Sequence, residues 1–478
     1  MGVFVVALLA VGCGTRVPDQ TTAAGNGLGG QTGSGPGGTG VGSGSGAGSA
    51  GGSGAGANAF GTLANPCGPS TGGANAATAQ GVTETEIRVS TIADPGGAKP
   101  GLNQGIHDSM KAFADWCNGF GGINGRKLIV DLKDAKLTQY KDRVVEACQD
   151  SFALVGGLGV LDQLGAQDAV DCGLPNVPAA AVSPEATEAD YTVQPLPNPL
   201  KTYQVGSGMW VKDTFPGVAD KASALYSKLS IIEAQSNRLV EAYTSIGYTF
   251  IYRQSANINE TNWGPLVVAM KNQGVKYMTL TSSFEDIVPL QKEMAAQNYR
   301  PEVTELETNF YNVKYPQLAK EQGADTTNSY VKLPIWPFEE ADKNPAMSTY
   351  LSVLKKSVPE AQPEELGVQA FSAGLLFATA AKAAGPQLTR EALLTELHKV
   401  HEWTGGGLHG QSDPGANVPT SCFLMMKVEA GDNPGFSRYF PLPDKDKAIY
   451  DKGNGWSCPD NATVQLKADY GQGAKAKK

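Results

Sequence analysis

Few side chains in this sequence are spaced for catalysis, and the clearest candidate pattern is Gly157-Leu-Gly159-Val-Leu-Asp162. It follows an apolar run and begins like a glycine-rich turn that binds a dinucleotide, but Asp162 occupies the position of the third glycine. A helix N-terminus that suits an anion accounts for this turn without a nucleotide. The sequence has no Gly-x-Ser-x-Gly elbow between a predicted strand and helix, and no His-Glu-x-x-His or P-loop pattern. We therefore expect no enzymatic activity and no cofactor.

Histidines and paired carboxylates are the next candidates for chemistry. His398 and His401 lie three residues apart in a predicted helix, with His409 eight residues beyond, and no Cys-x-x-Cys pair accompanies them. This spacing is poor for zinc, so surface and cap histidines are the favoured interpretation and no metal is predicted. The Glu-Glu pairs at 339–340 and 364–365 are interpreted as solvated helix starts.

The N-terminus is typical of an export signal, because an apolar run from Met1 to Gly12 leads directly into Cys13. The residues Leu9-Ala-Val-Gly-Cys13 resemble the bacterial lipobox, in which the signal is cut before a cysteine that carries lipid. Ala10 stands where Leu is usual, and no Lys or Arg precedes the apolar run. We predict a signal over residues 1–13 and lipidation of Cys13. An ordinary cleaved signal with an incidental cysteine is the alternative.

Export makes the other six cysteines candidates for three disulfides, and six cysteines allow fifteen connectivities. One pair lies at the ends of two predicted helices that flank a single strand, and a second pair brackets the last hairpin region. The third pair contains the cysteines that remain, although a reduced and buried Cys117 is an open alternative. The predicted pairs are Cys148–Cys172, Cys422–Cys458 and Cys67–Cys117.

The composition divides the 478-residue chain into a linker and a folded part. Seventeen of the 59 glycines fall in residues 25–57, and Arg16 and Asp19 are the only charged residues between 14 and 83. Such a segment cannot offset the entropy of ordering its backbone, so residues 14–80 are predicted to be a flexible linker. A net charge of −9 argues against a nucleic-acid partner. Residues 458–478 are expected to form a C-terminal tail, and its basic end at residues 475–478 is interpreted as a solvated terminus.

After the linker, the chain alternates short β-type runs with helical stretches, which predicts parallel sheets with helices on both faces. We predict an α/β fold with two hinged lobes: lobe 1 from residues 81–197 and 338–415, and lobe 2 from residues 198–337 and 416–457. The helical portion over residues 345–401 has no strands of its own, so it should pack on the first sheet. Parallel sheets bind ligands at the C-terminal ends of their strands, which places a site in the cleft between the lobes.

Residues Ala114–Leu128, which read ADWCNGFGGINGRKL, resemble the signature of type I periplasmic binding proteins, the leucine/isoleucine/valine-binding family of ABC importers. Other segments that resemble the family, in order, are IRVSTIAD (87–94), KLIVDLKDAK (127–136), LVGGLG (154–159) and VSPEAT (182–187). The sequence is most similar to actinobacterial lipoproteins of this family, which share FSAGLLFATAA (371–381) and EWTGGGLHG (402–410). The resemblance covers residues 81–456 and implies a two-lobed, hinged fold.

The resemblance implies a ligand site at the strand ends, and the family's contacts carry over only in part. Members that bind α-amino acids hold the carboxylate with hydroxyls and backbone N–H groups of the strand-three turn, and this turn lacks a hydroxyl here. Asp162 either faces the cleft, where it favours an amine or hydroxyls, or caps a helix; Trp336 either covers the ligand or belongs to the core or hinge. The predicted ligand-binding residues are Gly159, Val160, Asp162, Ser183, Thr187, Asn309, Phe310, Tyr311 and Trp336.

The resemblance implies a binding protein with no chemistry of its own. We expect a monomeric, extracytoplasmic lipoprotein, anchored to the outer face of the cell membrane by its lipid. It would close on a small polar, amino-acid-like molecule and deliver it to an ABC permease in the membrane, because the ligand binds the closed form more tightly. The alternative is a sensor that presents its ligand to a separate signalling protein, since the same fold serves receptors.

Overall fold

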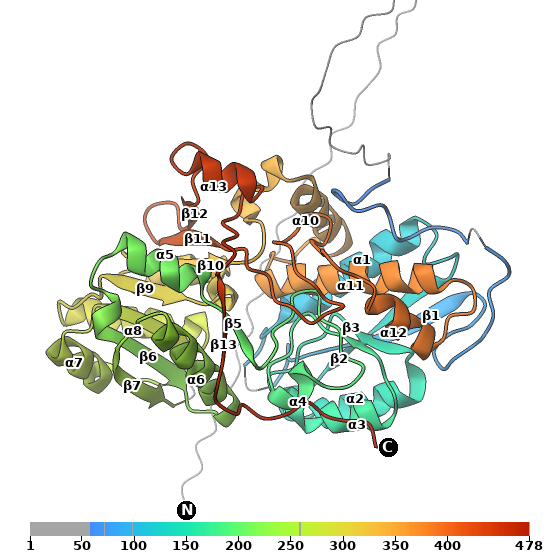
Figure 1. Ribbon diagram of the computed structural model, residues 1–478, viewed down its shortest axis with the longest axis horizontal. Coiled ribbons are helices and arrows are strands. Elements are labelled where there is room, and N and C mark those ends of the chain that lie inside the picture. Colours follow the sequence, from blue (N-terminus) through green and yellow to red (C-terminus); the bar gives the residue numbers. More distant parts are fainter. Residues whose placement is uncertain (1–57, 71, 98, 258–259, 478) are drawn as a thin grey trace, which may run out of the picture. The chain divides into compact units, whose positions relative to one another are not determined.

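The computed structural model describes residues 58–477 except residues 71, 98 and 258–259. The predicted signal, Cys13 and the part of the predicted linker before residue 58 lie outside the described residues. In the described part, helices and strands alternate along the chain and build two main sheets, each with its own set of helices (Figure 1). The predicted mixed α/β architecture is therefore confirmed.

The first sheet has four parallel strands in the order β2-β1-β3-β4. Ile87 and Val89 of β1 face one side of the sheet, and Ile92 and Leu154 face the other; all four are buried. Both faces are apolar because helices cover both, as in other parallel sheets. The strands are β1 (Glu86–Ala93), β2 (Lys127–Asp134), β3 (Ala153–Val155) and β4 (Asn176–Val177).

Two groups of helices enclose the first sheet. On one face α1 and α11 pack together, with the rings of Phe113 and Phe371 5.3 Å apart and edge to face. On the other face α2 and α3 contribute buried residues such as Val144 and Ala169. Since α10 to α12 also pack on this lobe, the prediction for residues 345–401 is confirmed. The helices are α1 (Gln104–Gly119), α2 (Tyr140–Asp150), η1 (Asp162–Leu164), α3 (Ala166–Asp171), α4 (Pro184–Thr187), η4 (Phe338–Lys343), α10 (Pro345–Ser357), α11 (Glu365–Ala384) and α12 (Arg390–Leu397).

Helix α11 is the one described helix that is long and apolar enough to cross a membrane. Its 20 residues pack against α1, α12 and the ends of β3 and β4, and 78% of its most apolar window is buried inside the protein. The apolar character of α11 is therefore explained by its place in the core of the first lobe.

The second sheet has seven strands in the order β12-β11-β10-β9-β8-β6-β7. Strands β6 to β10 are parallel, whereas β11 and β12 add to one edge as an antiparallel pair. The strands are β6 (Ala222–Ser227), β7 (Phe250–Ala256), β8 (Tyr277–Thr281), β9 (Val303–Leu306), β10 (Ser329–Leu333), β11 (Leu424–Glu429) and β12 (Gly435–Phe440).

Helices again follow the strands of the second sheet, and a short antiparallel pair, β5 with β13, lies beside it. Proline at the start of α7 and glycine just after its end suit those two positions, since Gly274 adopts a φ of 67°. The remaining elements are β5 (Thr202–Gln204), α5 (Gly206–Thr214), η2 (Ala219–Lys221), α6 (Ser230–Ser245), α7 (Gly264–Gln273), α8 (Phe284–Ala296), η3 (Thr308–Phe310), α9 (Lys314–Gln322), α13 (Lys447–Lys452) and β13 (Thr463–Gln465).

The chain passes between the two sheets at residues 194–204, 334–344 and 410–423, which we call the hinge segments. They are joined to one another by hydrogen bonds: Ser412 Oγ donates to the carbonyl of Pro195 at 2.6 Å, and the Gly410 N–H donates to the carbonyl of Pro334 at 2.8 Å. Three adjacent connections of this kind let two lobes rotate about a shared axis without separating.

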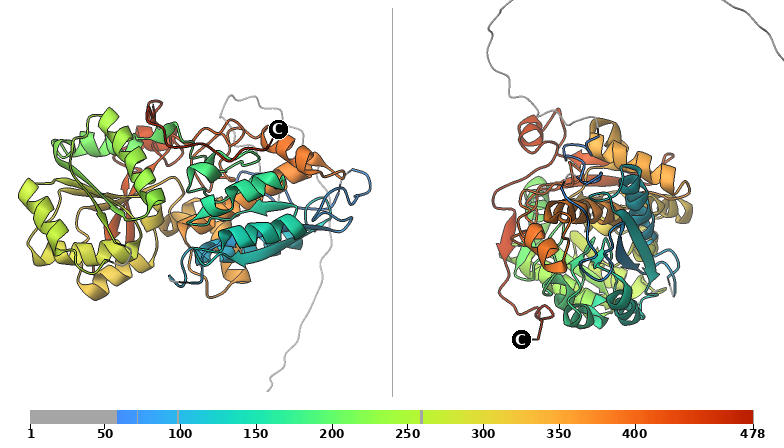
Figure 2. Two further views of the ribbon diagram at one scale, coloured as in Figure 1. Left: turned by 90° about the horizontal axis from the view of Figure 1, so that it is seen from below. Right: turned by 90° about the vertical axis from the view of Figure 1, so that its right-hand side faces the viewer.

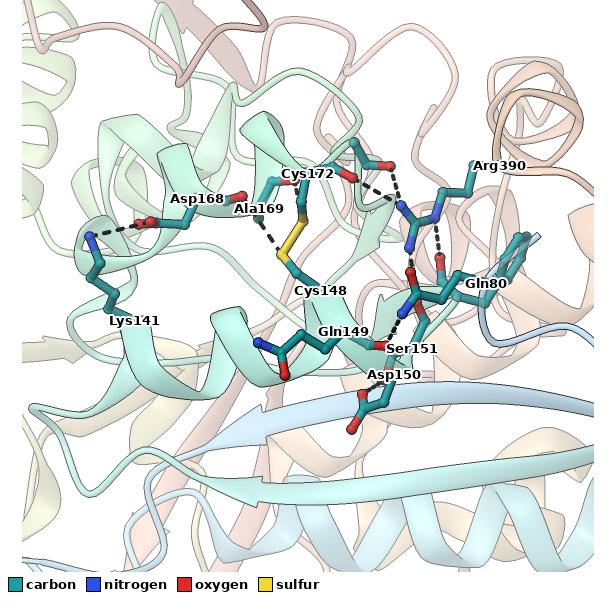
Figure 3. The surroundings of a disulfide bond; sticks show 12 residues. Gln80, Lys141, Cys148, Gln149, Asp150, Ser151, Asp168, Ala169, Cys172 and Arg390 are labelled. Atoms are coloured by element: carbon teal, nitrogen blue, oxygen red, sulfur yellow. Dashed lines mark hydrogen bonds and ion pairs between the residues drawn. A yellow bond between two sulfur atoms is a disulfide. The ribbon is translucent and has the colours of Figure 1, made fainter.

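The structure contains the three predicted disulfides, Cys67–Cys117, Cys148–Cys172 and Cys422–Cys458. The bond between Cys148 of α2 and Cys172, just after α3, lies beside the guanidinium of Arg390 from α12 (Figure 3). Arg390 donates to the carbonyl oxygens of Ser151, Phe152 and Cys172. The disulfide and the arginine therefore fix the same corner of the first lobe, one by a covalent bond and the other by hydrogen bonds.

The predicted end of the linker at residue 80 differs from the structure. The ring of Phe60 is fully buried and stacks on Phe371 with centroids 5.2 Å apart, and the Thr62 N–H donates to the carbonyl of Gly406 at 2.8 Å. A few residues later, Cys67 is joined to α1 through its disulfide. One aromatic side chain and one cysteine are enough to bind this segment to the first lobe, and the low charge of the segment does not reveal them.

The C-terminal tail predicted over residues 458–478 is attached to both lobes, while Lys475 and Lys477 at its basic end are exposed. Strand β13 pairs with β5, and the hydroxyl of Tyr470 donates to Glu241 at 2.7 Å. Further along, the N–H and carbonyl of Ala474 bond to Glu185 and Asp190, respectively, each at 2.9 Å. The C-terminal segment therefore runs from the second lobe to the α4 side of the first, as Figures 1 and 2 show in dark red. Backbone hydrogen bonds hold it, and a pattern of side chains cannot predict these.

Candidate functional site

Two cavities lie where the C-terminal ends of the parallel strands of both sheets meet. The hinge cavity, of about 320 Å³, is lined by the hinge segments together with α6, α11 and the ends of β9 and β10. The loop cavity, of about 470 Å³, is lined by the loops after β1 and β8, by residues 309–321 and by the start of α11. Leu366 of α11 lines both cavities, so they are neighbours in one cleft.

The hinge cavity is lined mainly by uncharged polar side chains, with apolar ones between them. Hydroxyls and amides come from both lobes and from the hinge, and the apolar contribution includes Leu239, Leu366 and Phe423. The polar uncharged residues are Asn198, Thr202, Tyr203, Gln204, Gln235, Thr281, Thr308, Gln369 and Thr420. Such a lining suits a small polar solute that exchanges hydrogen bonds with its surroundings.

Lys332 and Glu307 are the charged residues that line the hinge cavity, and they form an ion pair with Nζ and Oε1 2.9 Å apart. The Tyr203 hydroxyl donates to the same oxygen at 3.4 Å, and the Lys332 ammonium lies 5.5 Å from the centroid of the Tyr203 ring. Burial by itself lowers the pKa of Lys332, but Glu307, Tyr203 and Glu305 outweigh it, so the pKa is raised. The lysine therefore stays charged, and its charge is neutralised within the protein.

A second carboxylate, Glu305, lies close to this ion pair and also raises the pKa of Lys332. Glu305 of β9 is 2% exposed and accepts hydrogen bonds from the hydroxyls of Tyr243 at 2.8 Å and Tyr277 at 2.9 Å. Burial raises the pKa of Glu305, while the charge of Lys332 and the tyrosine donor act in the opposite direction. This end of the second sheet therefore contains a hydrogen-bonded network in which each charge has a partner.

The loop cavity differs because carboxylates dominate its charged lining. Glu285, Glu321, Glu364 and Glu365 line it, against a single lysine, Lys314. The ammonium of Lys99 lies at the edge, 3.3 Å from the hydroxyl of Ser283. The cavity is therefore acidic overall, in contrast to the neutral hinge cavity.

The start of α11 places two of these carboxylates at a helix N-terminus, where the helix dipole stabilises negative charge. Glu364 accepts from the Gly105 N–H at 3.1 Å in the first lobe and from Asn312 Nδ2 at 3.5 Å in the second. Glu365 is 2% exposed; its carboxylate accepts from the Gln369 amide, and a hydrogen bond with the Thr308 hydroxyl also lowers its pKa. Burial raises the pKa of Glu365 to about 7.

Polar contacts also join the lobes across the cleft. Besides Asn312 with Glu364 and Lys99 with Ser283, Gln235 Nε2 of α6 donates to the carbonyl of Val182 at 2.6 Å. Each of these is a polar contact between exposed or half-buried groups, of a kind that water replaces at little cost when two surfaces separate.

The turn after β3 (residues 156–162) and the segment after β4 (residues 182–187) are held in shape mainly by hydrogen bonds within the first lobe. Asp162 is 2% exposed and accepts from the backbone N–H groups of Val182 at 2.8 Å and Ser183 at 2.9 Å, and burial raises its pKa to about 6. Val160 donates its N–H to Asp94 at 2.8 Å, and Gly159 packs against Tyr140. Ser183 caps α4. The hydroxyl of Thr187 is buried and has no partner among the described residues.

The other predicted residues divide between the loop cavity and the core. Asn309 and Tyr311 line the loop cavity. Phe310 is fully buried against Tyr315, and Trp336 is 4% exposed, donates its indole N–H to the Glu340 carbonyl and lies under the Arg438 guanidinium. Core or hinge packing, the alternative considered for Trp336, matches these contacts.

The two Glu-Glu pairs lie at helix starts as predicted, but their solvation was predicted correctly only for Glu339, which is exposed and accepts from Tyr311. Glu364 and Glu365 are covered by residues of both lobes, and Glu340 is paired with Arg438. Sequence reasoning also missed Glu307 and Lys332. The available signal was their position, since Glu307 follows β9 directly and Lys332 lies in β10, the two strands next to each other in the sheet.

Two facing α/β lobes with polar cavities between their strand ends define a solute-binding protein that holds its ligand in a cleft. A sequence profile described as "Periplasmic binding protein" matches residues 86–433. The chain belongs to this family, whose members bind solutes and are not enzymes. No relative was found among curated protein sequences.

Solved structures of similar fold include a fatty acid ABC transporter substrate-binding protein from Thermomonospora curvata, with a TM-score of 0.65 and 14% identity over 82% of this chain and 99% of that one. The leucine-binding protein LivK from Thermotoga maritima has a TM-score of 0.60 and 13% identity over 73% and 97% of the two chains. LivJ from Streptococcus pneumoniae, in complex with isoleucine, has a TM-score of 0.60 and 15% identity over 74% and 100%. These likenesses confirm the two-lobed fold.

Proposed function

We propose that this chain is the substrate-binding protein of an ABC importer and captures a small polar, amino-acid-like solute between its lobes. The observation that carries the proposal is the pair of cavities at the strand ends, each lined by residues of both lobes. A solute that contacts both lobes binds the closed form more tightly and shifts the population toward it. The rotating bodies are residues 81–197 with 338–415, and residues 198–337 with 416–457.

Transport is supported by the similar structures, which include a substrate-binding protein of a fatty acid ABC transporter and one of a branched-chain amino acid transporter. The polar lining of the hinge cavity favours an amino-acid-like solute over a fatty acid, because an alkyl chain would leave its amides and hydroxyls without partners. Asn309 and Tyr311 would contact the solute in the loop cavity, while Asp162 and Ser183 would hold the first-lobe wall in shape.

A lipid anchor is part of the same proposal, and the support for it comes from the sequence alone. Lipid on Cys13 would hold the protein at the outer face of the cell membrane, beside the permease that receives the solute. The variant Cys13→Ser should move the protein from the membrane fraction to the soluble fraction without changing its thermal stability. Equal membrane recovery of both proteins would contradict the anchor.

The binding function is tested by thermal unfolding of the full chain against a panel of amino acids, amides, polyols, aromatic acids and short peptides. A solute at 100-fold its Kd adds about 2.7 kcal/mol of apparent stability, and closure should reduce the radius of gyration measured by small-angle scattering. The variant Gln235→Ala, in the hinge cavity, should weaken binding about tenfold, whereas the exposed Gln273→Ala should not. Absence of stabilisation by every member would overturn the proposal.

A further inference from the structure

The C-terminal segment forms a strap, residues 463–477, that the second lobe holds at one end and the first lobe at the other (Figure 1). At its beginning, β13 pairs with β5 and Leu466 is 5% exposed in the core of the second lobe. Tyr470 then donates its hydroxyl to Glu241 of α6 at 2.7 Å. Just before the strap, Cys458 is joined to a hinge segment through its disulfide. The strap is therefore firmly attached on the side of the second lobe.

The tip of the strap, residues 473–477, fits a site on the first lobe. Ala474 is 6% exposed in a small apolar cluster that includes Ala186 of α4, and its N–H donates to the carbonyl of Glu185 at 2.9 Å. Gly473 lies so close to the backbone of Glu188 that an added Cβ would be 1.8 Å from the carbonyl oxygen. The shape of this site therefore requires glycine at position 473.

Two ion pairs complete the contact of the tip. Lys475 pairs with Asp190 at 3.1 Å, and Lys477 pairs with Asp171 at 2.8 Å. The two lysine side chains are 62% and 81% exposed, so water and salt screen these pairs and each contributes little. The tip is therefore the end of the strap that can detach at a small cost, since it leaves one alanine and a few polar groups to water.

The strap is short where it passes from one lobe to the other. Three residues separate Tyr470, held on α6, from Ala474, held beside α4, and a fully extended chain of this length spans at most about 14 Å. The same two helices meet across the cleft, because Gln235 of α6 donates to the carbonyl of Val182, just before α4, at 2.6 Å. While both ends are held, the strap limits how far this edge of the cleft can open.

We propose that the strap is a latch on the hinge motion: the docked tip holds the two lobes together, and full opening of the cleft requires the tip to leave the first lobe. The inference rests on the lobe rotation of the proposed function, and it extends that function because it concerns the protein before any solute binds. A docked tip and a bound solute both favour the closed form, so each strengthens the other by the same factor.

The experiment measures the distance between the lobes in the full chain without solute. Spin labels are attached at Asp142→Cys in α2 and Thr244→Cys in α6, both exposed, in a Cys13→Ser background, and their separation is measured by pulsed electron resonance. Deletion of residues 471–478 should lengthen the mean distance by about 5 Å or more, as a rotation of about 15° does at about 20 Å from the axis.

A point variant tests the docking site itself. Gly473→Ala keeps the length and the charges of the strap but places a methyl group against the backbone of Glu188, so it should lengthen the distance as the deletion does. The matched control is Gly431→Ala, between β11 and β12, where the added methyl group meets nothing within 4 Å. This control should keep the parent distance.

The outcomes separate the latch from the function on which it rests. A parent-like distance in both the deletion and Gly473→Ala would overturn the latch, and so would an effect of the deletion that Gly473→Ala does not share. An equal shift in Gly431→Ala would also overturn it, because any added methyl group would then loosen the lobes. None of these results depends on a solute, so failure of every member of the solute panel to bind would overturn the binding function and leave the latch in place.

Discussion

Glu305 and Glu365 are two carboxylates with the same exposure, 2%, and opposite surroundings. Glu305 accepts from two tyrosine hydroxyls and lies close to the charge of Lys332, whereas Glu365 has only uncharged donors, the Gln369 amide and the Thr308 hydroxyl. Burial raises the pKa of both side chains. Burial alone therefore does not decide how well a buried carboxylate is compensated; the presence of a cationic partner does.

The largest effect is expected where the paired network loses its only cation. Lys332→Met leaves Glu305 and Glu307 close together without the charge that compensates them, which should cost about 3–5 kcal/mol of unfolding free energy. Urea unfolding at pH 7 measures this loss. The control is Lys276→Met, which removes an ion pair of similar length, 2.8 Å, whose side chains are 40% and 51% exposed. That change should cost less than about 1 kcal/mol, and equal losses would refute the network.

Glu365→Gln should raise the free energy of unfolding, in contrast to Lys332→Met, and the size of this gain should depend on pH. The pKa of Glu365 is about 7 in the folded protein against an ordinary value of 4.5, so the folded state retains a proton that the unfolded state releases between these values. Stability associated with Glu365 is therefore present below pH 4.5 and lost as pH rises toward 7. The variant removes this loss and should be more stable than the parent by about 2–3 kcal/mol at pH 8, with little difference at pH 4.

Urea midpoints across pH 4 to 8 measure the effect of Glu365→Gln, with Glu360→Gln as the exposed control that should follow the parent throughout. A variant less stable than the parent at pH 8 would show that the buried carboxylate is satisfied in the folded protein, which would remove the contrast with Glu305.

A smaller loss is expected from Tyr277→Phe, which removes one of the two hydroxyl donors to Glu305 and nothing else. A lost hydrogen bond to a buried carboxylate costs about 1–2 kcal/mol. Tyr226→Phe is the matched control, because its hydroxyl donates to Glu233 at the exposed surface, where water takes its place. If both changes cost the same in denaturant unfolding, the donors to Glu305 contribute no more than those at the surface.

The sequence predicted the elements that follow a strong local pattern. Alternating apolar runs and helical stretches place both sheets. Two disulfides follow from cysteines that flank predicted elements, and the third pair consists of the cysteines that remain. The predicted end of the linker was wrong because a single buried aromatic side chain, Phe60, attaches this segment to the first lobe. Attachment of the C-terminal tail was not predicted because backbone hydrogen bonds, such as those of Ala474, hold it on the first lobe. Neither signal is visible in the composition of a segment.

The cleft was less predictable because its residues are assembled across long separations. Glu364 gains its burial from Gly105 and Asn312, which lie in different lobes, so two adjacent glutamates before a helix give no sign of it. Lys332 was hidden for the same reason: a lysine in a strand indicates a solvated edge unless a carboxylate such as Glu307 faces it. Partner sets of this kind depend on tertiary packing.

The smallest effect concerns two buried threonine hydroxyls. Thr187 is 2% exposed and its Oγ1 has no partner among the described residues, whereas Thr91 Oγ1 donates to the Val155 carbonyl at 2.7 Å. Valine has the shape of threonine without the hydroxyl, so Thr187→Val loses no hydrogen bond and should change stability by less than about 0.5 kcal/mol, while Thr91→Val should cost about 1 kcal/mol. Calorimetric unfolding of both variants distinguishes them. If Thr187→Val costs as much as Thr91→Val, the hydroxyl of Thr187 is bonded in the free protein and is as well partnered as that of Thr91.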